Sequence, residues 1–332
     1  MLRTYIRNGS QLKSGPAEPR SAAADPACPL VWFDLFNPTI EEDRLVEELI
    51  GVSIPTREEM QEIEVSARLY QENGAEFMTI TAVTQLDTEE PMTTPITFVL
   101  KGSMLVTVRY AEPKAFANFM VRALKPNAVP CSNGEQIMMG LIEALFDRIA
   151  DALEQVGVDI DAISRKVFRK KSGAKAASST QDLQAIIERI GQNGDLLTMV
   201  RESLVSINRV LTYHTSVDQE DKKVTKEAKA RTKVLYRDGV ALTDQATFLS
   251  NKINFLLDAT LGLINLQQNQ IIKIFSVAAV VFLPPTLVAS IYGMNFEHMP
   301  ELKWLLGYPW ALLLMAASAI LPYHFFKRRG WL

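Results

Sequence analysis

Ten residues in the C-terminal part of the chain recur at alternating steps of four and three. Most of them are small or carry an oxygen atom, and steps of this kind place side chains along one stripe of an α-helix. Hard divalent cations prefer oxygen ligands, so the stripe could offer oxygens repeatedly to an ion. We call these ten residues the polar seam: Asp258, Gly262, Asn265, Asn269, Ile272, Ser276, Ala279, Leu283, Thr286 and Ser290.

The spacing of the polar seam alone permits two interpretations. Small residues let helices pack closely in membranes, which would make the seam a packing or dimer face. Alternatively, several copies of the helix could surround a water-filled axis and turn the seam toward it. Asn265 and Asn269, with Asp258 preceding them, favour the ion path because they present oxygens in succession.

The polar seam enters the first of two apolar stretches, residues 274–296 and 304–326, each about 23 residues long. A helix needs roughly 20 residues to cross the hydrocarbon core, so both are predicted to span a lipid bilayer. The loop 297–303 permits only a tight hairpin. Pro284 and Pro285 lie inside the first span, where they either kink it for packing or free carbonyls that line a conduit.

Charges beside the spans predict their orientation. Lys273 precedes the first span and the basic tail 327–332 follows the second, whereas the loop carries Glu297, Glu301 and a single lysine. Basic residues favour the cytoplasmic side, so both termini are predicted to be cytoplasmic. Lys327, Arg328 and Arg329 serve first as a topology anchor.

The rest of the chain is predicted to be an α/β domain that leads into a helical stalk. We expect a mobile lead-in over 1–29, a cytoplasmic α/β domain with a helical hairpin over 30–215, and a stalk helix over 216–273. Thr39 and Glu42 match a capping box that opens a helix. Strands are predicted at 31–35, 77–83, 96–100 and 104–108, with a hairpin turn at 101–103, and helices at 135–168 and 180–213.

Composition excludes several classes of function. The formal net charge is −3 at pH 7 and no basic face stands out, so no nucleic-acid partner is predicted. No phosphate-binding loop is present, so no nucleotide is expected. No nucleophile–base arrangement suggests an enzyme. Cysteines and histidines are too few and too scattered for a metal cluster: Cys28, Cys131, His214, His298 and His324.

The segment from Tyr292 to Leu302 resembles the CorA family of divalent metal (magnesium/cobalt) channels, in its bacterial branch. The hallmark is the tripeptide Gly293-Met294-Asn295 at the outer end of the first span, followed by Met-Pro-Glu-Leu at 299–302. Strong resemblance covers about residues 250–332, while the remainder agrees in layout only. Met294 argues against zinc transporters of the same superfamily, which usually carry isoleucine there.

The resemblance implies a homopentamer in the bacterial inner membrane that takes up Mg²⁺ down the membrane potential, with Co²⁺ and Ni²⁺ as further cargo. Asn295 would form the outer selecting ring, and Thr286, Asn269 and Asp258 fall at family pore positions. Ile272 and Leu283 fall at apolar constrictions, where family members often carry methionine. Glu297 and Glu301 would concentrate cations outside, or simply keep the loop soluble.

The resemblance also implies closure by cytoplasmic Mg²⁺ that bridges acidic residues of neighbouring subunits. The candidates are Asp238 on the stalk, with Asp244 in reserve, and the acidic turn with Asp87, Glu89 and Glu90. Ordinary solvated charges are the alternative for all of them. The basic residues Lys273, Lys327, Arg328 and Arg329 would surround the inner mouth of the pore.

Two other functions stay open on the sequence. A zinc transporter would keep the architecture and change the ion. A membrane-tethered cytoplasmic sensor or scaffold would use the hairpin only as an anchor, and such an anchor has no use for the polar seam.

Overall fold

The structure is a computed structural model of the 332-residue chain. It describes residues 1–9, 11–15, 30–88, 90–125, 131–168, 180–220, 226–294 and 299–330. The chain divides into two compact units, Met1–Leu256 (unit 1) and Leu257–Leu332 (unit 2).

The described part of unit 1 contains a seven-stranded sheet with the order β2-β1-β3-β7-β6-β5-β4. Strands β3 and β7 pair in parallel, with Phe33 opposite Val106, and the other neighbours pair antiparallel. The strands are β1 (Leu2–Asn8), β2 (Gln11–Ser14), β3 (Leu30–Phe36), β4 (Leu69–Glu72), β5 (Ala75–Thr84), β6 (Met92–Lys101) and β7 (Met104–Arg109).

The predicted mobile lead-in over 1–29 is wrong for its first half, because β1 and β2 belong to the sheet. Tyr5 is buried and stacks on Trp32 with ring centroids 4.7 Å apart, and Leu12 is also buried. Burial of these side chains, together with pairing of β1 to β3, holds the segment in place. Residues 16–29 lie outside the described part of the chain.

Short helices cover one face of the sheet. The capping box of Thr39 and Glu42 is confirmed at the start of α2 (Ile40–Ile50), which ends at Gly51 with a left-handed φ of 66°. Val46 and Ile50 of α2 pack into an apolar cluster with sheet residues such as Phe33. Two further short helices, α3 (Arg57–Met60) and α4 (Val65–Arg68), lead into β4.

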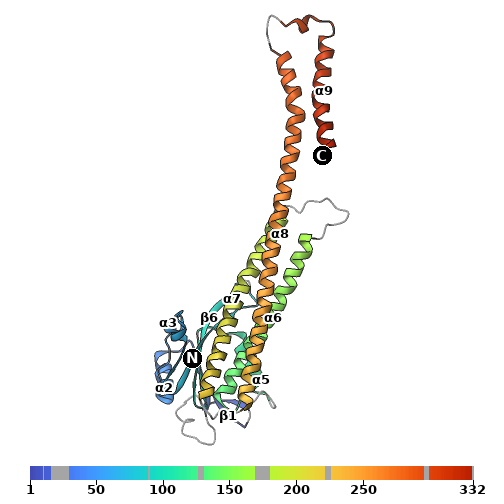
Figure 1. The fold of residues 1–332 in the computed structure, drawn as a ribbon. Coiled ribbons are helices and arrows are strands. Elements are labelled where there is room, and N and C mark those ends of the chain that lie inside the picture. The colour runs from blue at the N-terminus through green and yellow to red at the C-terminus, as the bar shows by residue number, and fades with distance from the viewer. Residues whose placement is uncertain are drawn as a thin grey trace. The chain divides into compact units, whose positions relative to one another are not determined.

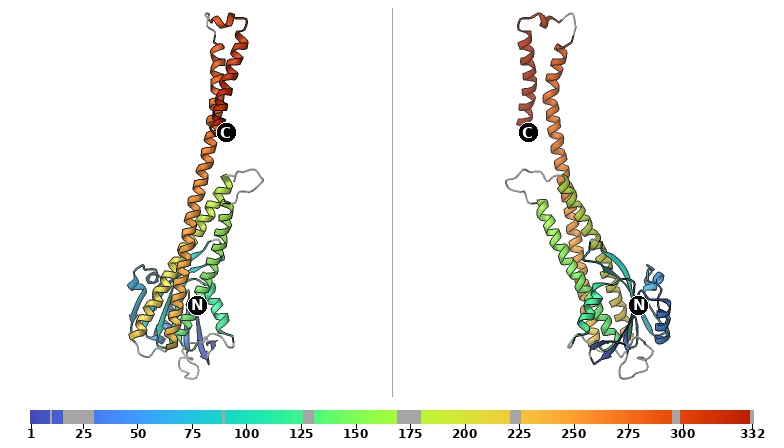
Figure 2. Two further views of the ribbon diagram at one scale, coloured as in Figure 1. Left: turned by 45° about the vertical axis from the view of Figure 1, so that its right-hand side comes forward. Right: turned by 180° about the vertical axis from the view of Figure 1, so that it is seen from behind.

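The short helix α5 (Lys114–Ala123) and the long helices α6 (Gly134–Phe168) and α7 (Thr180–Glu220) pack against the sheet as well. In Figures 1 and 2, α6 and α7 run alongside the first part of α8 (Lys226–Tyr292). The predicted stalk start at 216 is wrong, since α7 continues to Glu220 and α8 begins at Lys226. Buried Val210, Leu211 and His214 keep the end of α7 packed on unit 1.

Ion pairs and close packing fix the first part of α8 within unit 1. Arg231 pairs with Glu143 of α6 at 3.0 Å, and Lys252 pairs with Asp161 of α6 at 2.5 Å. A Cβ on Gly239 would lie 2.1 Å from Oδ1 of Asn208 in α7. A larger residue at 239 would therefore require the side chain of Asn208 to shift.

Unit 2 contains the remainder of α8, a 3₁₀ turn at Pro300–Lys303 and α9 (Gly307–Arg328). Both helices are long and apolar enough to cross a membrane, and only 6% of the apolar window of each is buried. A core helix of a soluble domain would be mostly buried. The predicted spans shift slightly: α8 ends at Tyr292, and α9 runs from Gly307 to Arg328 instead of 304–326.

Candidate functional site

The polar seam lies on an open face of α8. All ten of its residues are exposed, and even Ile272 and Leu283 are 60% and 65% exposed. The less exposed residues of the same stretch form a different stripe, which includes Val277, Val281 and Val288. Figure 1 shows α9 running beside this part of α8, and Ala311 of α9 is buried like Val277. The polar seam thus lies apart from the packed stripe.

The prolines change the backbone next to the polar seam. Pro284 and Pro285 lie inside α8 and have no N–H, so the carbonyls of Val280 and Val281 lose their usual helical donors. One turn further on, the hydroxyl of Thr286 donates to the carbonyl oxygen of Phe282 at 2.8 Å. That oxygen of Thr286 still has lone pairs with which to accept hydrogen bonds.

A single copy of the polar seam cannot complete the shell of a cation. Six to eight oxygen ligands surround Mg²⁺ or Ca²⁺, whereas one helix presents one oxygen-bearing side chain per turn or less. Among the described residues, no group of three or more His, Cys, Asp or Glu side chains is placed to hold a metal ion. The seam therefore suits either several copies around one ion or an ion that keeps its water.

The C-terminal end of α8 is closed by backbone hydrogen bonds. The Gly293 N–H donates to the carbonyl of Ala289 at 2.9 Å, and the Met294 N–H donates to that of Ile291 at 3.2 Å. Met294 is 48% exposed. Asn295, Glu297 and the side chain of Glu301 lie outside the described part of the chain, so their predicted roles stay predictions.

The predicted basic residues are exposed on both helices of unit 2. The ammonium of Lys327 lies 6.0 Å from the ring centroid of Tyr323, and the guanidinium of Arg329 lies 5.3 Å from that of Phe325. Arg328 and Lys273 are exposed too. Aromatic rings thus hold two of these cations at the end of α9.

Asp87, one of the predicted regulatory ligands, is already paired with two cations of its own chain. Its two oxygens lie 2.5 Å from the Lys114 ammonium and 2.7 Å from the Arg148 guanidinium. Hydrogen bonds from Lys114 and then Arg148 hold the pKa of Asp87 below its usual value. A metal ion at Asp87 would have to compete with both cations. Glu90 is exposed nearby, and Glu89 lies outside the described residues.

The stalk candidates lie on two grooves of unit 1. Asp238 lines a groove of about 450 Å³ between α6 and α8, together with Glu143 and Asp147. Asp147 pairs with Arg122 at 3.2 Å, as Glu143 does with Arg231. Asp244 lines another groove, of about 480 Å³, between α7 and α8. The candidate carboxylates are therefore spread over different faces.

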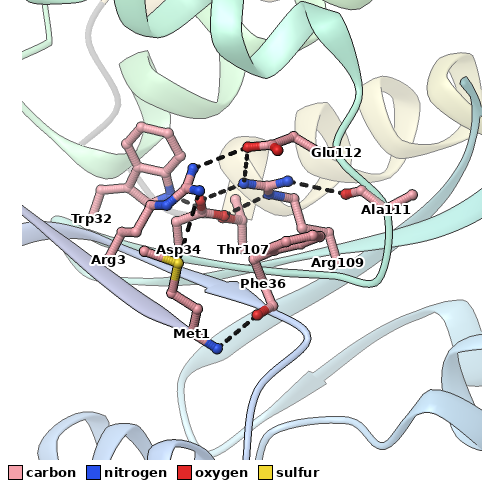
Figure 3. A network of polar contacts seen from close by, with 9 residues as sticks. All are labelled: Met1, Arg3, Trp32, Asp34, Phe36, Thr107, Arg109, Ala111 and Glu112. Carbon is pink, nitrogen blue, oxygen red and sulfur yellow. Dashed lines mark hydrogen bonds and ion pairs between the residues drawn. The ribbon is translucent and has the colours of Figure 1, made fainter. Parts of the chain in front are cut away.

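The sheet contains a buried ion pair that was not predicted from the sequence. Figure 3 shows Arg109 of β7 donating to both carboxylate oxygens of Asp34 in β3, at 2.9 and 2.8 Å. Thr107 donates to Asp34 at 2.9 Å and accepts from the Trp32 indole N–H at 3.0 Å. Asp34 and Arg109 are 2% and 1% exposed. A charged residue within an otherwise apolar strand was the available signal.

These features define a class first: a membrane protein with a large N-terminal α/β unit and two C-terminal helices of spanning length. Residues 29–328 match the family described as CorA-like Mg²⁺ transporter protein, and the chain belongs to that family. The resemblance stated from Gly293-Met294-Asn295 is thereby confirmed at the level of the family.

Curated relatives match along nearly the whole chain. The magnesium transport protein CorA of Yersinia pseudotuberculosis serotype I (strain IP32953) is 35% identical over 303 residues, which cover 91% of this chain and 92% of that protein. The protein of the same description from Escherichia coli (strain K12) is 34% identical over 309 residues, covering 93% and 94%. Both are named as transport proteins, which agrees with a transporter rather than an enzyme.

The fold also matches a solved structure. The complete structure of the CorA magnesium transporter from Methanocaldococcus jannaschii aligns with a TM-score of 0.79 at 20% identity, covering 100% of this chain and 99% of that one. This confirms the predicted fold class, an α/β domain followed by a long helix and C-terminal apolar helices.

Proposed function

We propose that this chain is the subunit of a channel that carries Mg²⁺ into the cell down the membrane potential. One observation carries the proposal: the polar seam is exposed on a helix of spanning length, and the less exposed residues of that helix, such as Val277, lie on another stripe. Exposed oxygens on an apolar helix are costly in lipid unless they face water or other polar groups. The curated relatives, named for magnesium transport, supply the identity of the ion.

Several copies are needed to enclose such a path. With the polar seam turned inward, α8 lines the axis and α9 lies outside it. The number of copies, five, follows from the family resemblance. The family resemblance implies the bacterial inner membrane, and basic residues beside both spans favour an orientation with both termini in the cytoplasm. The stalk then leads from the cytoplasmic unit to the membrane, and residues 297–303 form the outer loop.

Selection is assigned to the Gly293-Met294-Asn295 tripeptide at the outer end of α8. Mg²⁺ sheds water reluctantly, so a ring of neutral Asn295 amides could accept hydrogen bonds from its hydration shell without stripping it. A carboxylate ring would bind more tightly and slow release. Co²⁺ and Ni²⁺ would follow the same path, and Glu297 and Glu301 would draw cations toward it.

The apolar members of the polar seam suit a gate. Ile272 and Leu283 would form rings that exclude water when they lie close together, which stops a hydrated ion. Oxygen-bearing residues such as Asn269 and Thr286 lie on either side of these positions. An ion that passes an apolar ring is thus met again by polar groups.

The membrane potential is a sufficient driving force. A doubly charged ion gains roughly 4.6 kcal/mol per 100 mV of inside-negative potential, twice the value for a single charge. Uptake therefore needs no nucleotide.

We extend the proposal to closure by cytoplasmic Mg²⁺. The ion would bridge Asp238 of one copy to acidic residues of its neighbour, and Glu89 and Glu90 are the candidates there. Asp87 would join only in competition with Lys114 and Arg148. The basic residues at the inner mouth would repel cations when they converge and so assist closure.

The test is Mg²⁺ flux into proteoliposomes at a fixed inside-negative potential. Wild type should take up Mg²⁺, Asn295→Ala should abolish uptake, and Asn118→Ala, an exposed residue of α5, should leave it unchanged. Uptake of Zn²⁺ without Mg²⁺ would overturn the choice of ion. Folded wild type that carries neither ion would leave the tethered sensor as the better description.

A further inference from the structure

The C-terminal turns of α9 (Figure 1) combine three consecutive cations with exposed aromatic rings. Lys327, Arg328 and Arg329 are all exposed. The Lys327 ammonium lies 6.0 Å from the ring centroid of Tyr323, and the Arg329 guanidinium lies 5.3 Å from that of Phe325. Tyr323 and Phe325 are themselves 40% and 55% exposed. We call these five residues the basic end of α9, which presents positive charge and apolar surface side by side.

The three cations of the basic end point in different directions. Successive residues of an α-helix are turned by ~100° about its axis, so three in a row spread over roughly 200°. Arg328 is the last residue of α9, and Arg329 keeps a right-handed helical backbone as its C-cap, with φ −84°. A single neighbouring helix therefore cannot cover all three. One of them can face the inner mouth of the pore while another faces lipid.

No carboxylate of the described residues balances these charges. The three cations have no ion-pair partner within the described part of the chain, and residues 302–332 contain no Asp or Glu. Asp258, the acidic residue of unit 2 whose side chain is described, belongs to the polar seam. The counter-ion of the basic end therefore comes from outside this copy.

We propose that the basic end of α9 binds anionic phospholipids of the surrounding membrane. Lys327, Arg328 and Arg329 would contact the headgroup phosphates, for which a guanidinium offers two parallel N–H donors. The acyl chains would cover the exposed rings and Leu321, which is 70% exposed one turn or less before them. Clusters of Lys and Arg on the cytoplasmic side of a span attract anionic headgroups in this way. The proposal rests on the proposed function only for the orientation of α9 in the membrane.

Other anions fit the basic end less well. Free phosphate would satisfy the cations and leave Tyr323, Phe325 and Leu321 exposed to water. An acidic side chain of a second copy would do the same. A phospholipid supplies both the phosphate and the hydrocarbon, and a long cationic side chain at a helix end reaches the headgroups while its stem stays in the apolar layer.

Electron paramagnetic resonance of spin-labelled lipids tests the proposal on the full chain in phosphatidylcholine bilayers. It measures how strongly labelled phosphatidylglycerol, relative to labelled phosphatidylcholine, is immobilised at the protein. The test variant is the triple change Lys327→Gln, Arg328→Gln, Arg329→Gln. The matched control changes net charge equally at three scattered exposed lysines: Lys125→Gln, Lys229→Gln, Lys303→Gln. Lys327→Arg, Arg328→Lys, Arg329→Lys keeps the charge and covers the case in which the test variant fails to fold.

We expect wild type, the control and the charge-keeping variant to prefer phosphatidylglycerol by about fivefold, the size expected for one cation at an anionic headgroup. The test variant should lose most of this preference. Wild type without a preference, or an equal loss in the control, would overturn the inference.

Two further arms separate this inference from its alternatives. Inorganic phosphate should reduce the preference no more than NaCl of equal ionic strength does. If it abolishes the preference where NaCl does not, the cations bind phosphate from any source and the lipid proposal is wrong. Mg²⁺ flux with and without Asn295→Ala is measured in parallel. Flux that depends on Asn295 without a lipid preference would overturn this inference alone, whereas a lipid preference without flux would contradict the proposed function alone.

Discussion

The two units of the chain differ in how many of their apolar and polar side chains are buried or paired within a single copy. In unit 1 the large apolar residues of the sheet are mostly buried, with Trp32 and Phe98 at 0% exposure. In unit 2 the same kinds of residue are open: Phe275 is 71% exposed and Leu305 is 99% exposed. Exposed apolar area on this scale requires a covering phase, which for unit 2 is lipid and other copies.

Polar groups show the same difference. Asp34 of unit 1 is buried but takes hydrogen bonds from Thr107 and Arg109 of its own chain. The oxygens of the polar seam in unit 2, such as those of Asn265 and Asn269, are exposed on an apolar helix. The core of unit 1 is thus satisfied within one copy, whereas the proposed ion path belongs to unit 2.

The largest effect should come from breaking the buried pair of unit 1. Asp34→Ala leaves the Arg109 guanidinium buried without its carboxylate and should cost about 3–5 kcal/mol of unfolding free energy. Thermal and urea unfolding of the purified chain in detergent, followed by circular dichroism, measures this. Asp258→Ala in the polar seam should change stability by less than about 0.5 kcal/mol, because Asp258 is exposed.

The double variant Asp34→Leu, Arg109→Leu distinguishes the cost of an unpaired buried charge from the cost of lost packing. Apolar residues of similar volume should recover most of the stability lost in Asp34→Ala. If the double variant is as unstable as the single one, the loss comes from packing around Trp32 rather than from an unpaired charge.

Two glycines of α8 allow the packing of the two units to be compared, with a smaller expected effect. Gly239→Ala would bring Cβ to 2.1 Å from Asn208 Oδ1 and 2.8 Å from Phe146, so it should destabilise unit 1 by about 1–3 kcal/mol. Gly262 in unit 2 has no atom within 4 Å of such a Cβ. Gly262→Ala should therefore leave the free energy of unfolding unchanged or raise it by up to about 1 kcal/mol, because alanine has the higher helix propensity.

Melting temperatures of both variants, with Mg²⁺ flux, check this prediction. A loss of flux in Gly262→Ala without loss of stability would show that the polar seam packs tightly against other copies. Unchanged melting in Gly239→Ala would show that α7 and α8 can separate slightly at no cost.

Much of unit 2 could be predicted from sequence because lipid imposes a simple rule of length and apolarity. The two spans and the stripe of the polar seam could be predicted from local sequence alone, because the spacing of residues shows which of them share a helix face. Helix ends shifted by a few residues, from Trp304 to Gly307 for example, because capping and turn geometry decide them locally.

Unit 1 was harder to predict, because its features depend on contacts between distant residues. Strand β1 was missed since its partner, β3, lies beyond residues rich in Gly, Ala and Pro. The pairing of Asp87 with Lys114 and Arg148 joins three elements that no local pattern connects. An acidic turn alone therefore could not show whether its carboxylates were available to a metal ion.

A pH effect of intermediate size is expected from Asp43 in α2. Burial, followed by the charges of Glu47 and Glu42, raises the pKa of Asp43 from 3.8 to about 6. A raised pKa means that its favourable contribution is full below about pH 4 and is lost as pH rises through about 6. Asp43→Asn should therefore stabilise the chain by on the order of 1 kcal/mol at pH 7 to 8.

Melting curves across this pH range for wild type and Asp43→Asn measure the difference, with Glu72→Gln as a control on an exposed carboxylate. Parallel curves for wild type and Asp43→Asn would contradict the assignment. If the melting temperature of Asp43→Asn depends less on pH than that of wild type, the burial of the Asp43 carboxylate destabilises unit 1 at high pH.

The smallest effect is expected at Asp87. This residue tests whether a carboxylate of unit 1 is paired only within its own copy. Its pKa is lowered by Lys114 and Arg148, so the stability it contributes is present at neutral pH and is lost as pH falls through the lowered pKa. Asp87 and Lys114 are 46% and 68% exposed, so Asp87→Asn should cost less than about 1 kcal/mol, and high salt should remove the difference.

Mg²⁺ provides the decisive arm of that experiment. If Lys114 and Arg148 are the permanent partners of Asp87, Mg²⁺ should raise the melting temperature of wild type and Asp87→Asn equally, with NaCl at the same ionic strength as reference. A rise that is specific to Mg²⁺ and requires Asp87 would mean that the cation displaces both side chains. Unit 1 would then also be incomplete in one copy, with its missing partner an ion that the proposed channel carries.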